Sequence, residues 1–374
     1  MTKSVESAKR IIISGGGTGG HIFPAIAIAN ALKRLDPATE ILFVGAKGRM
    51  EMERVPAAGY EIIGLNVQGI QRKSILKNLL LPFRLLGSVL QSISIINRFK
   101  PDAAVGVGGY ASGPLLYAAS WKKIPYLIQE QNSFAGITNK KLGKKAAKIC
   151  VAFDGMEQFF PSGKIIKTGN PVRKDSVDIK GKREQALKEF KLSADKKTIL
   201  VTGGSLGART LNESVLAGLD DIKKADVQLV WQTGKFYFGG IKDTLGANIP
   251  ADVRVLEFLT RMDLAYAAAD VIISRAGAGT IAELCVVGKP VILVPSPNVA
   301  EDHQTKNAQS LVKENACEYI PDRDAIQKLV PAALELLKNE HKQKSLGSNI
   351  SKLALPDADE VIAKEVFKMV KQSS

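Results

Sequence analysis

The residues that could do chemistry begin in RIIISGGGTGGHIFPAIAIANAL, residues 10–32, where a glycine-rich loop separates an apolar run from a helix-like segment. Backbone N–H groups at a helix start bind phosphate oxygens, and glycine lets an anion come close. His21 is the first bulky side chain after the loop, in the expected first turn of the helix. The helix dipole disfavours the imidazolium there, so we expect a neutral ring that can act as a general base. The alternative is an ordinary first-turn residue that donates a hydrogen bond.

Two further glycine-rich loops also follow apolar runs, GVGGYASGP at 106–114 and GGSLGAR at 203–209. Three such loops favour a site for diphosphate-bearing ligands, although each one alone is equally typical of a tight turn. The first loop also fits GxGxxG, the dinucleotide pattern, which requires an acid at the end of the second strand. That strand ends in Gly45, Ala46 and Lys47, and Asp36 precedes it. A nicotinamide-dependent oxidoreductase is therefore the disfavoured alternative.

Apolar runs alternate with helix-compatible segments, which is typical of an α/β fold with parallel sheets. In the first half we expect strands at 10–14, 40–45, 61–65, 102–107, 125–129 and 148–153. In the second half we expect them at 198–203, 227–232, 253–257, 270–274, 290–294 and 317–320. Both halves begin as strand, glycine turn and helix, so we predict two Rossmann-like domains facing across a cleft. The predicted parts are a first domain at 1–171, a second at 172–356, and a helix at 357–374 that docks back near the hinge.

Composition and charge narrow the function. A length of 374 residues, with 45% hydrophobic and 24% charged residues, suits two globular cores. Residues 1–171 carry 23 Lys and Arg against 10 Asp and Glu, and the rest carry 29 against 27, which divides the net charge of +15 into +13 and +2. A basic first half predicts an anionic surface or substrate there. Aromatic residues are only 6% and no nucleic-acid motif is present, so we expect no nucleic-acid partner.

The cysteines and the polar start indicate the compartment. Cys150, Cys285 and Cys317 are odd in number and far apart, which favours free thiols in a reducing compartment. The first ten residues are polar, and the apolar run after them is too short for a signal peptide. We therefore expect a protein on the cytoplasmic side.

Four segments together resemble the MurG family of bacterial peptidoglycan glycosyltransferases. They are GGGTGGHIFPAIAIA (15–29), QEQNSFAGITNK (129–140), GNPVR (169–173) with GGSLGAR, and SRAGAGTIAEL (274–284) with EDHQTKNA (301–308). The resemblance spans nearly the whole chain and implies a GT-B fold. It implies inverting transfer of N-acetylglucosamine from the substrate UDP-N-acetylglucosamine to lipid I, undecaprenyl-diphospho-N-acetylmuramoyl-pentapeptide. In such enzymes the second domain binds the donor and the first meets acceptor and membrane, in agreement with the charge division.

The resemblance also implies donor contacts, and their residue types suit that role. An Arg beside a glycine turn suits a diphosphate, a Glu one turn into a helix can accept ribose hydroxyls, and the backbone of a Leu can read the uracil edge. Without the family pattern, Arg173 is typical of a solvated linker and Glu283 of a helix surface. The implied donor residues are Thr18, Gly19, Gly20, Asn132, Arg173, Ser205, Leu259, Ala278, Gly279, Thr280, Glu283 and Gln304.

Catalytic and acceptor residues complete the predicted site. His21 is our candidate base, with Glu130 as second choice. For the acceptor diphosphate we expect Gly17, Gly108, Gly109, Tyr110 and Ser112. The spacings Asp322-Arg323-Asp324 and Asp357-Ala358-Asp359 could hold a metal, but both precede helical patterns and are better interpreted as N-caps. We expect no obligatory metal or cofactor.

The basic, apolar segment 71–101 is the candidate membrane contact. Pro82 and its charges exclude a simple span, so it could lie in a membrane interface or, over 88–99, pack on the sheet. The membrane candidates are Leu79, Leu80, Leu81, Phe83, Arg84, Lys140, Lys141 and Lys144. We expect a peripheral protein on the cytoplasmic face of the inner membrane, with other cell-wall synthesis proteins as further partners. The remaining alternatives are a GT-B transferase with another lipid acceptor, such as diacylglycerol, and a nucleotide-sugar-binding module without catalysis.

Overall fold

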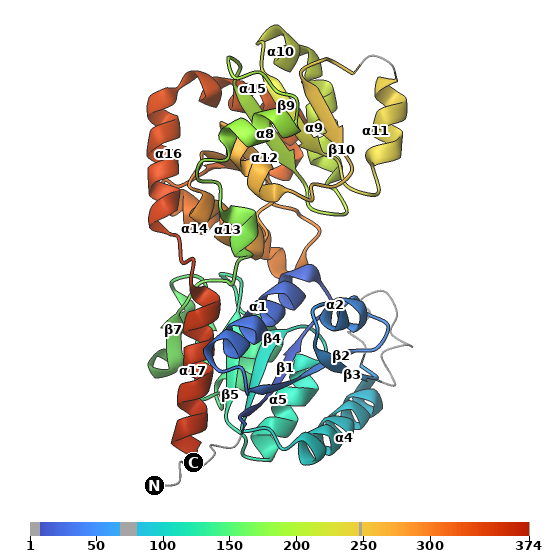
Figure 1. The fold of residues 1–374 in the computed structure, drawn as a ribbon, viewed down its shortest axis with the longest axis vertical. Coiled ribbons are helices and arrows are strands. Elements are labelled where there is room, and N and C mark those ends of the chain that lie inside the picture. Colours follow the sequence, from blue (N-terminus) through green and yellow to red (C-terminus); the bar gives the residue numbers. More distant parts are fainter. Residues whose placement is uncertain (1–7, 68–80, 247–248, 374) are drawn as a thin grey trace. The chain divides into compact units, whose positions relative to one another are not determined.

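The structure is a computed structural model that describes residues 8–67, 81–246 and 249–373. The chain forms two compact units (Figure 1). The first unit comprises Met1–Pro171 and Asp357–Ser374, and the second unit comprises Val172–Pro356. Each unit contains one parallel sheet with helices packed on it.

The sheet of the first unit has the order β3-β2-β1-β4-β5-β6-β7. Strand β1, inside this sheet, carries three isoleucines with no exposed surface. Because side chains alternate along a strand, Ile11 and Ile13 pack on one face and Ile12 on the other. The strands are β1 (Arg10–Gly15), β2 (Glu40–Ala46), β3 (Glu61–Leu65), β4 (Ala103–Gly108), β5 (Tyr126–Glu130), β6 (Lys148–Val151) and β7 (Ile165–Lys167).

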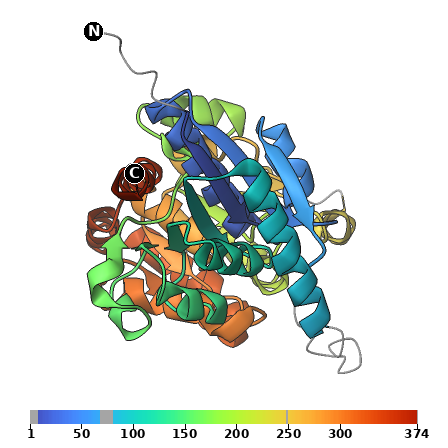
Figure 2. The ribbon, with the colours of Figure 1, turned by 90° about the horizontal axis from the view of Figure 1, so that it is seen from below.

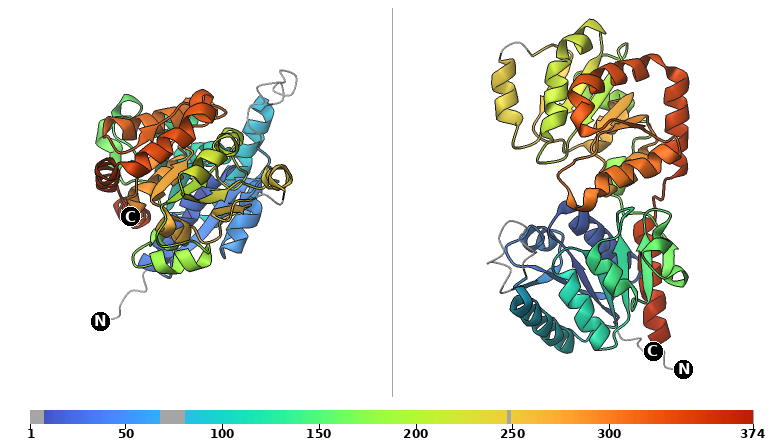
Figure 3. Two further views of the ribbon diagram at one scale, coloured as in Figure 1. Left: turned by 90° about the horizontal axis from the view of Figure 1, so that it is seen from above. Right: turned by 180° about the vertical axis from the view of Figure 1, so that it is seen from behind.

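Helices cover both faces of this sheet. The helices of the first unit are α1 (Gly19–Leu35), α2 (Glu51–Ala57), α4 (Leu81–Phe99), α5 (Ser112–Trp121), α6 (Ile137–Gly143) and α17 (Ala358–Ser373), with short 3-10 turns at Met156–Gln158 and Ser162–Lys164. Helix α17 is far from α1 in sequence but packs beside it, burying Ile362 and Val366 in the cluster that contains Ile11 (Figure 1). Arg34 and Asp359 join the two helices by an ion pair of 2.6 Å. Helices α4 and α5 pack against each other and cover the other face (Figures 2 and 3).

The sheet of the second unit has the order β10-β9-β8-β11-β12-β13. Its strands are β8 (Thr198–Thr202), β9 (Gln228–Gln232), β10 (Val253–Leu256), β11 (Val271–Ser274), β12 (Val291–Leu293) and β13 (Glu318–Tyr319). Its helices are α7 (Lys174–Val177), α8 (Arg183–Glu189), α9 (Arg209–Ala217), α10 (Leu219–Lys224), α11 (Phe238–Leu245), α12 (Met262–Ala268), α13 (Ala278–Val287), α14 (His303–Lys313), α15 (Ala325–Lys338) and α16 (Glu340–Lys352), with 3-10 turns at Ala300–Asp302 and Asp322–Asp324.

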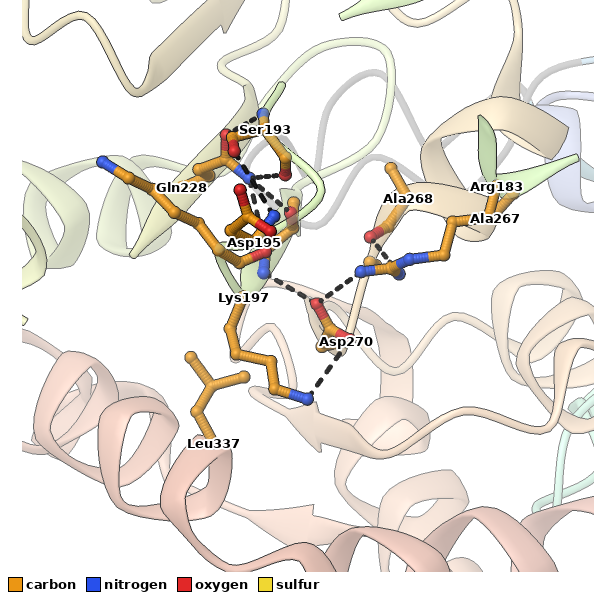
Figure 4. Close-up of polar contacts among 12 residues, drawn as sticks. Arg183, Ser193, Asp195, Lys197, Gln228, Ala267, Ala268, Asp270 and Leu337 are labelled. Carbon is orange, nitrogen blue, oxygen red and sulfur yellow. Dashed lines mark hydrogen bonds and ion pairs between the residues drawn. The ribbon is translucent and has the colours of Figure 1, made fainter. Parts of the chain in front are cut away.

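A polar cluster closes the amino edge of the second sheet (Figure 4). Asp270, just before β11, accepts hydrogen bonds from Thr198 N at 2.8 Å and from Arg183 Nη2 at 3.2 Å. Gln228, the first residue of β9, accepts one from Ser193 N at 2.6 Å. These bonds anchor α8 and the turn that follows it to the strand starts. The charges of this cluster therefore lie at the opposite edge from the strand ends that carry the predicted donor loops.

All the strands expected from the sequence are present, and the predicted α/β fold is confirmed. The sequence prediction missed β7, a three-residue strand at the end of the sheet order, because its two apolar residues, Ile165 and Ile166, are flanked by Lys164 and Lys167. Strand order reverses between β1 and β4 in the first unit and between β8 and β11 in the second. Ligands of open parallel sheets bind at such reversals, outside the carboxyl ends of the strands.

Candidate active site

In the first unit, the loops that follow β1 and β4 pack backbone against backbone. Gly16 N donates a hydrogen bond of 3.2 Å to Gly108 O. A Cβ on Gly109 would lie 2.3 Å from Gly16 O, so only glycine allows this approach. Two of the predicted phosphate loops therefore meet at the strand-order reversal, and the Gly108-Gly109 pair is required for loop packing whether or not a phosphate binds.

His21 lies against both loops. It is the third residue of α1, whose N-cap is Thr18, so the expected first-turn position is confirmed. His21 Nδ1 lies 3.1 Å from Gly16 O and 3.3 Å from Thr18 Oγ1. Because a carbonyl oxygen only accepts hydrogen bonds, the contact with Gly16 O favours the tautomer of a neutral ring that carries its proton on Nδ1 and its lone pair on Nε2. A Cβ on Gly108 would lie 2.6 Å from His21 Cδ2, which means that this glycine sets the position of the ring.

Glu51, the first residue of α2, was not predicted from the sequence but occupies the centre of this corner. Its carboxylate accepts hydrogen bonds from Gly17 N at 2.8 Å and Ala46 N at 3.0 Å, and the residue is 1% exposed. Two glycines make room for it, because a Cβ on Gly16 would lie 2.2 Å from Glu51 Oε1 and one on Gly45 would lie 2.6 Å from Cγ. The role of Glu51 could not be predicted from the sequence, because the segment GRMEMERVP (48–56) resembles the charged, solvated start of a helix.

Two of the predicted acceptor-diphosphate residues are engaged by other protein groups. The Gly17 N–H already donates to the Glu51 carboxylate, whose negative charge would repel a phosphate. Ser112 is 1% exposed, and its hydroxyl lies 2.8 Å from Gly108 O and 2.9 Å from Ser14 O. Tyr110 is 47% exposed, with the Arg49 guanidinium 5.8 Å from its ring centroid. Phosphate contact at Tyr110 and Gly109 stays a prediction.

Glu130 holds the loop that follows β5. It is 3% exposed and accepts hydrogen bonds from Asn132 N at 3.1 Å, Gly136 N at 3.2 Å and Asn139 Nδ2 at 2.8 Å. Burial raises the pKa of the Glu130 carboxyl, and these hydrogen bonds partly offset that rise. This is the setting of a carboxylate that positions a loop, here the loop that carries the predicted donor residue Asn132. His21 is therefore the better-placed candidate base.

In the second unit, Glu283 lies on α13 with partners on two other elements. Its side chain is 18% exposed. Tyr266, itself 1% exposed, donates its hydroxyl to Glu283 Oε2 at 3.2 Å, and Arg173 Nε lies 3.8 Å from Oε1. Burial raises the pKa of the Glu283 carboxyl, while Arg173 and the Tyr266 hydrogen bond lower it. The structure thus brings two predicted donor residues together, and it adds Tyr266, which the alanine-rich segment around it did not reveal.

The strand-order reversal of the second unit carries a helix start suited to phosphate. Helix α13 begins at Ala278 with Gly277 as N-cap and has no acidic residue in its first turn. No acidic residue of its own first turn therefore offsets the positive end of the helix dipole. Ser205, in the loop after the adjacent strand β8, is exposed. The first turn of α13, with Gly279 and Thr280, can accept an anion through its N–H groups.

Two other predicted donor residues are engaged by neighbouring groups. Leu259 is 4% exposed, and its backbone N–H donates to Gln232 Oε1 at 2.9 Å. A base edge that bound this N–H would replace Gln232. Gln304, near the start of α14, accepts a hydrogen bond from Ser296 N at 2.8 Å. Both donor contacts stay predictions, as do those of Thr18, Gly19 and Gly20, which begin α1.

The paired aspartates are bound to basic or hydroxyl groups. Asp322 forms an ion pair with Arg275 and accepts from Thr210 Oγ1 at 3.0 Å, while Asp324 pairs with Lys328 at 3.1 Å. Asp324 is the N-cap residue of α15, but it makes no side-chain cap hydrogen bond, so this N-cap interpretation is correct in position and wrong in mechanism. The described residues contain no group of three or more His, Cys, Asp or Glu that could hold a metal ion.

The candidate membrane segment is only partly described. Leu79 and Leu80 lie outside the described residues, as does the side chain of Leu81. On α4, Phe83, Leu86 and Leu90 are 73%, 59% and 55% exposed and share one helix face.

The basic residues near this segment lie in different settings. Arg84 of α4 and, beyond α6, Lys144 are exposed, and Lys141 is exposed on α6 itself. The ammonium of Lys140, by contrast, lies over the rings of Phe134 and Phe159, at 4.0 and 4.5 Å from their centroids. Within the described parts of the chain, no helix has the length and apolar character needed to cross a membrane.

Comparison with known proteins connects these two sites to one family. The glycosyltransferase family 28 N-terminal domain matches residues 11–151, and the family 28 C-terminal domain matches residues 198–362. A UDP-N-acetylglucosamine–N-acetylmuramyl-(pentapeptide) pyrophosphoryl-undecaprenol N-acetylglucosamine transferase from Bacteroides fragilis is 58% identical over 369 residues, covering 98% of this chain and 97% of that protein. The crystal structure of Acinetobacter baumannii MurG matches with a TM-score of 0.78 and 29% identity over 96% of this chain and 99% of that chain. This chain belongs to the MurG family.

These comparisons confirm both the MurG family and the GT-B fold that the sequence motifs predicted. A relative of the same name from Parabacteroides distasonis is 55% identical over 361 residues, covering 96% of this chain and 98% of that protein. The glycotransferase of kitacinnamycin, at 14% identity and a TM-score of 0.73 over 97% of this chain and 99% of that chain, shows the fold alone. The nicotinamide-dependent oxidoreductase is thereby set aside, and the chain is a glycosyltransferase.

Proposed function

We propose that this chain transfers N-acetylglucosamine from UDP-N-acetylglucosamine to the muramoyl 4-hydroxyl of lipid I, giving the β-1,4-linked disaccharide lipid of peptidoglycan synthesis. The observation that carries the proposal is the 58% identity, over nearly the whole of both chains, to the Bacteroides fragilis transferase. Because this identity extends over both units, it supports the same donor and acceptor for this chain.

The second unit provides the donor-binding groups. The first turn of α13 and Arg173 offer N–H donors and positive charge for the diphosphate. Glu283 offers carboxylate oxygens for the ribose hydroxyls. The Tyr266 hydroxyl donates a hydrogen bond to that carboxylate and holds it in place. Arg173 favours the charged form of Glu283, in which both oxygens accept hydrogen bonds.

His21 supplies the base for a single inverting displacement. The acceptor oxygen attacks the anomeric carbon while the bond to UDP breaks, and the electron pair of that bond leaves with the UDP oxygen. The hydroxyl proton moves to Nε2 of His21, because Nδ1 is already protonated toward Gly16 O. Positive charge and helix N–H groups stabilise the leaving diphosphate. His21→Ala is expected to lower kcat about 100-fold with little change in donor affinity.

The reaction proceeds without an obligatory metal in this proposal. Asp322, Asp324 and Asp359 are paired with Arg275, Lys328 and Arg34, so a metal bound to these carboxylates would have to displace basic partners. Turnover should persist in EDTA. Loss of turnover in EDTA that a divalent ion restores would contradict this part of the proposal.

Membrane attachment is peripheral and uses the exposed face of α4. Phe83, Leu86 and Leu90 would enter the interface, while Lys141 and Lys144 attract anionic lipid. The net charge of +13 on residues 1–171 favours the anionic cytoplasmic face of the membrane. Other proteins of wall synthesis are proposed as partners there.

The test is a transfer assay with purified protein, radiolabelled UDP-N-acetylglucosamine and a lipid I analogue, with His21→Ala as the matched control. Labelled disaccharide lipid is the expected product. Transfer to diacylglycerol but not to the lipid I analogue would favour the other GT-B acceptor. Tight donor binding with no transfer to either acceptor would favour a binding module and overturn the proposal.

A further inference from the structure

A single peptide unit connects Glu51 to His21. The C=O of the Gly16–Gly17 peptide accepts from His21 Nδ1 at 3.1 Å, and the N–H of the same peptide donates to Glu51 Oε2 at 2.8 Å. The preceding Gly15–Gly16 peptide is also fixed, because Gly16 N donates to Gly108 O at 3.2 Å. A buried carboxylate and the candidate base are thus the two ends of one hydrogen-bonded chain.

The hydrogen bonds from Glu51 through the peptide to His21 form a relay in which each group polarises the next. A carboxylate that accepts from an amide N–H polarises the amide and increases the negative charge on its carbonyl oxygen. That oxygen then accepts more strongly from Nδ1–H, and most strongly when the ring is an imidazolium. The two hydrogen bonds and the width of one peptide place the carboxylate roughly 8 Å from the ring. At this distance, inside a partly buried corner, the negative charge also favours the imidazolium directly.

We propose that Glu51 is a positioning residue for the transfer reaction, which acts on His21 through the Gly16–Gly17 peptide by fixing the Nδ1–H tautomer and stabilising the imidazolium that forms. The inference rests on the proposed function. In this proposal Glu51 acts through the peptide and takes no proton from the acceptor. The acceptor proton moves to Nε2, and no proton moves along the relay.

The packing around Glu51 indicates more than the filling of a hole. Gly16 and Gly45 both leave space for this side chain, and each of its oxygens accepts one backbone N–H, from Gly17 and from Ala46. A neutral Gln of the same size cannot reproduce this pair, because its NH2 group would face one of the two N–H donors. The site therefore selects a carboxylate.

Other charged groups near this corner are constant across the variants that test the proposal. They are Arg49, whose guanidinium lies near the Tyr110 ring, Tyr110 itself, and Glu130 beyond the neighbouring strand. On α17, which packs on α1, Asp359 and Glu365 are paired with Arg34 and Lys368. A change seen in Glu51→Gln alone is therefore attributable to Glu51.

The test compares Glu51→Gln with Glu53→Gln, which removes the same charge from an exposed position on the same helix. Glu51→Gln is expected to lower kcat about tenfold and to move the acidic limb of the kcat–pH profile about one pH unit lower, because a less stabilised imidazolium loses its proton at lower pH. Glu53→Gln is expected to leave both unchanged. In a His21→Ala background, Glu51→Gln is expected to change kcat less than twofold, since the relay then has no end point.

Equal loss of kcat in both backgrounds, or an acidic limb that stays in place, would reduce Glu51 to a structural role and overturn the proposal. A second measurement needs no turnover. An NMR titration of the imidazole nitrogens is expected to show the Nδ1–H tautomer for His21, with a midpoint that falls in Glu51→Gln, while His303 and His341 serve as internal references. If the His21 midpoint falls in Glu51→Gln but the protein has no transferase activity, only the proposed function is refuted. If the His21 midpoint is the same in Glu51→Gln as in the parent, only the role of Glu51 is refuted.

Discussion

Gly108→Ala tests whether one missing Cβ sets the position of the candidate base. The added carbon would lie 2.6 Å from His21 Cδ2 and 2.8 Å from Nε2, whereas ordinary contacts begin at 3.4 Å. The ring must therefore retreat by roughly 0.8 Å, and a misplacement of about 1 Å can cost about 100-fold in rate. We expect kcat to fall about 100-fold, close to the loss expected for His21→Ala, with the donor KM within about threefold of the original value.

Backbone strain is the competing cause, and Gly59→Ala controls for it. Gly108 has φ of 105° and Gly59 has φ of 86°, so alanine is strained at both, at roughly 1–3 kcal/mol. Nothing lies within 4 Å of a Cβ at Gly59. Each kcal/mol lowers Tm by about 2–4 °C in a domain of this size, so both variants should melt several degrees lower. Steady-state kinetics below both melting temperatures then isolates the contact.

The reasoning is refuted if folded Gly108→Ala retains kcat within twofold of the parent, or if Gly59→Ala loses as much activity as Gly108→Ala. In the first case the ring position does not limit the reaction. In the second case strain alone explains the loss.

Three further predictions follow from burial and exposure. Glu283→Gln should raise the KM for UDP-N-acetylglucosamine at least about tenfold. Because burial raises the pKa of the Glu283 carboxyl, its ionisation destabilises the fold as pH rises through that pKa, so the variant should match or exceed the parent's Tm at pH 7.5. A lower Tm of the variant at that pH would contradict the direction of the pKa shift. Burial raises the pKa of each of the cysteine thiols to about 12, so a thiol reagent at pH 8 should label none in the native protein and all 3 in denaturant; rapid native labelling would show that these sites open. Replacing Phe83 and Leu86 by Ser should weaken sedimentation with anionic vesicles at least about tenfold while kcat on a soluble acceptor analogue is unchanged, and equal binding by both proteins would exclude this helix face from the membrane contact.

Local pattern was sufficient for most of the fold. Alternating apolar runs predicted the strands because a buried parallel strand needs β-branched and aliphatic residues on both faces, as Ile11, Ile12 and Ile13 show. Strand β7 was missed because its two apolar residues are flanked by lysines, which makes the run resemble a loop. The first-turn position of His21 followed from a glycine loop placed between a strand and a helix.

The details of the site needed partners distant in sequence. Phosphate contact at Gly17 was predicted from the loop alone, which gave no sign that Glu51, from another element, accepts that N–H. Nor did the sequence show that the Ser112 hydroxyl turns inward to the carbonyls of Gly108 and Ser14. Hydrogen-bond partners of this kind depend on which loops meet, and no periodicity records that.

By itself, the sequence determined the strand and helix pattern, the family motifs and the excess of positive charge in the first half, because each is a property of neighbouring residues or of composition. Only the tertiary structure showed the role of Gly108 and Gly109 near His21. The strand order brings the loops after β1 and β4 together, and that contact requires Gly108 and Gly109 to lack side chains. Only then does the Gly16–Gly17 peptide lie between Glu51 and His21, because a hydrogen bond needs its two groups within about 3 Å, whatever their separation along the chain.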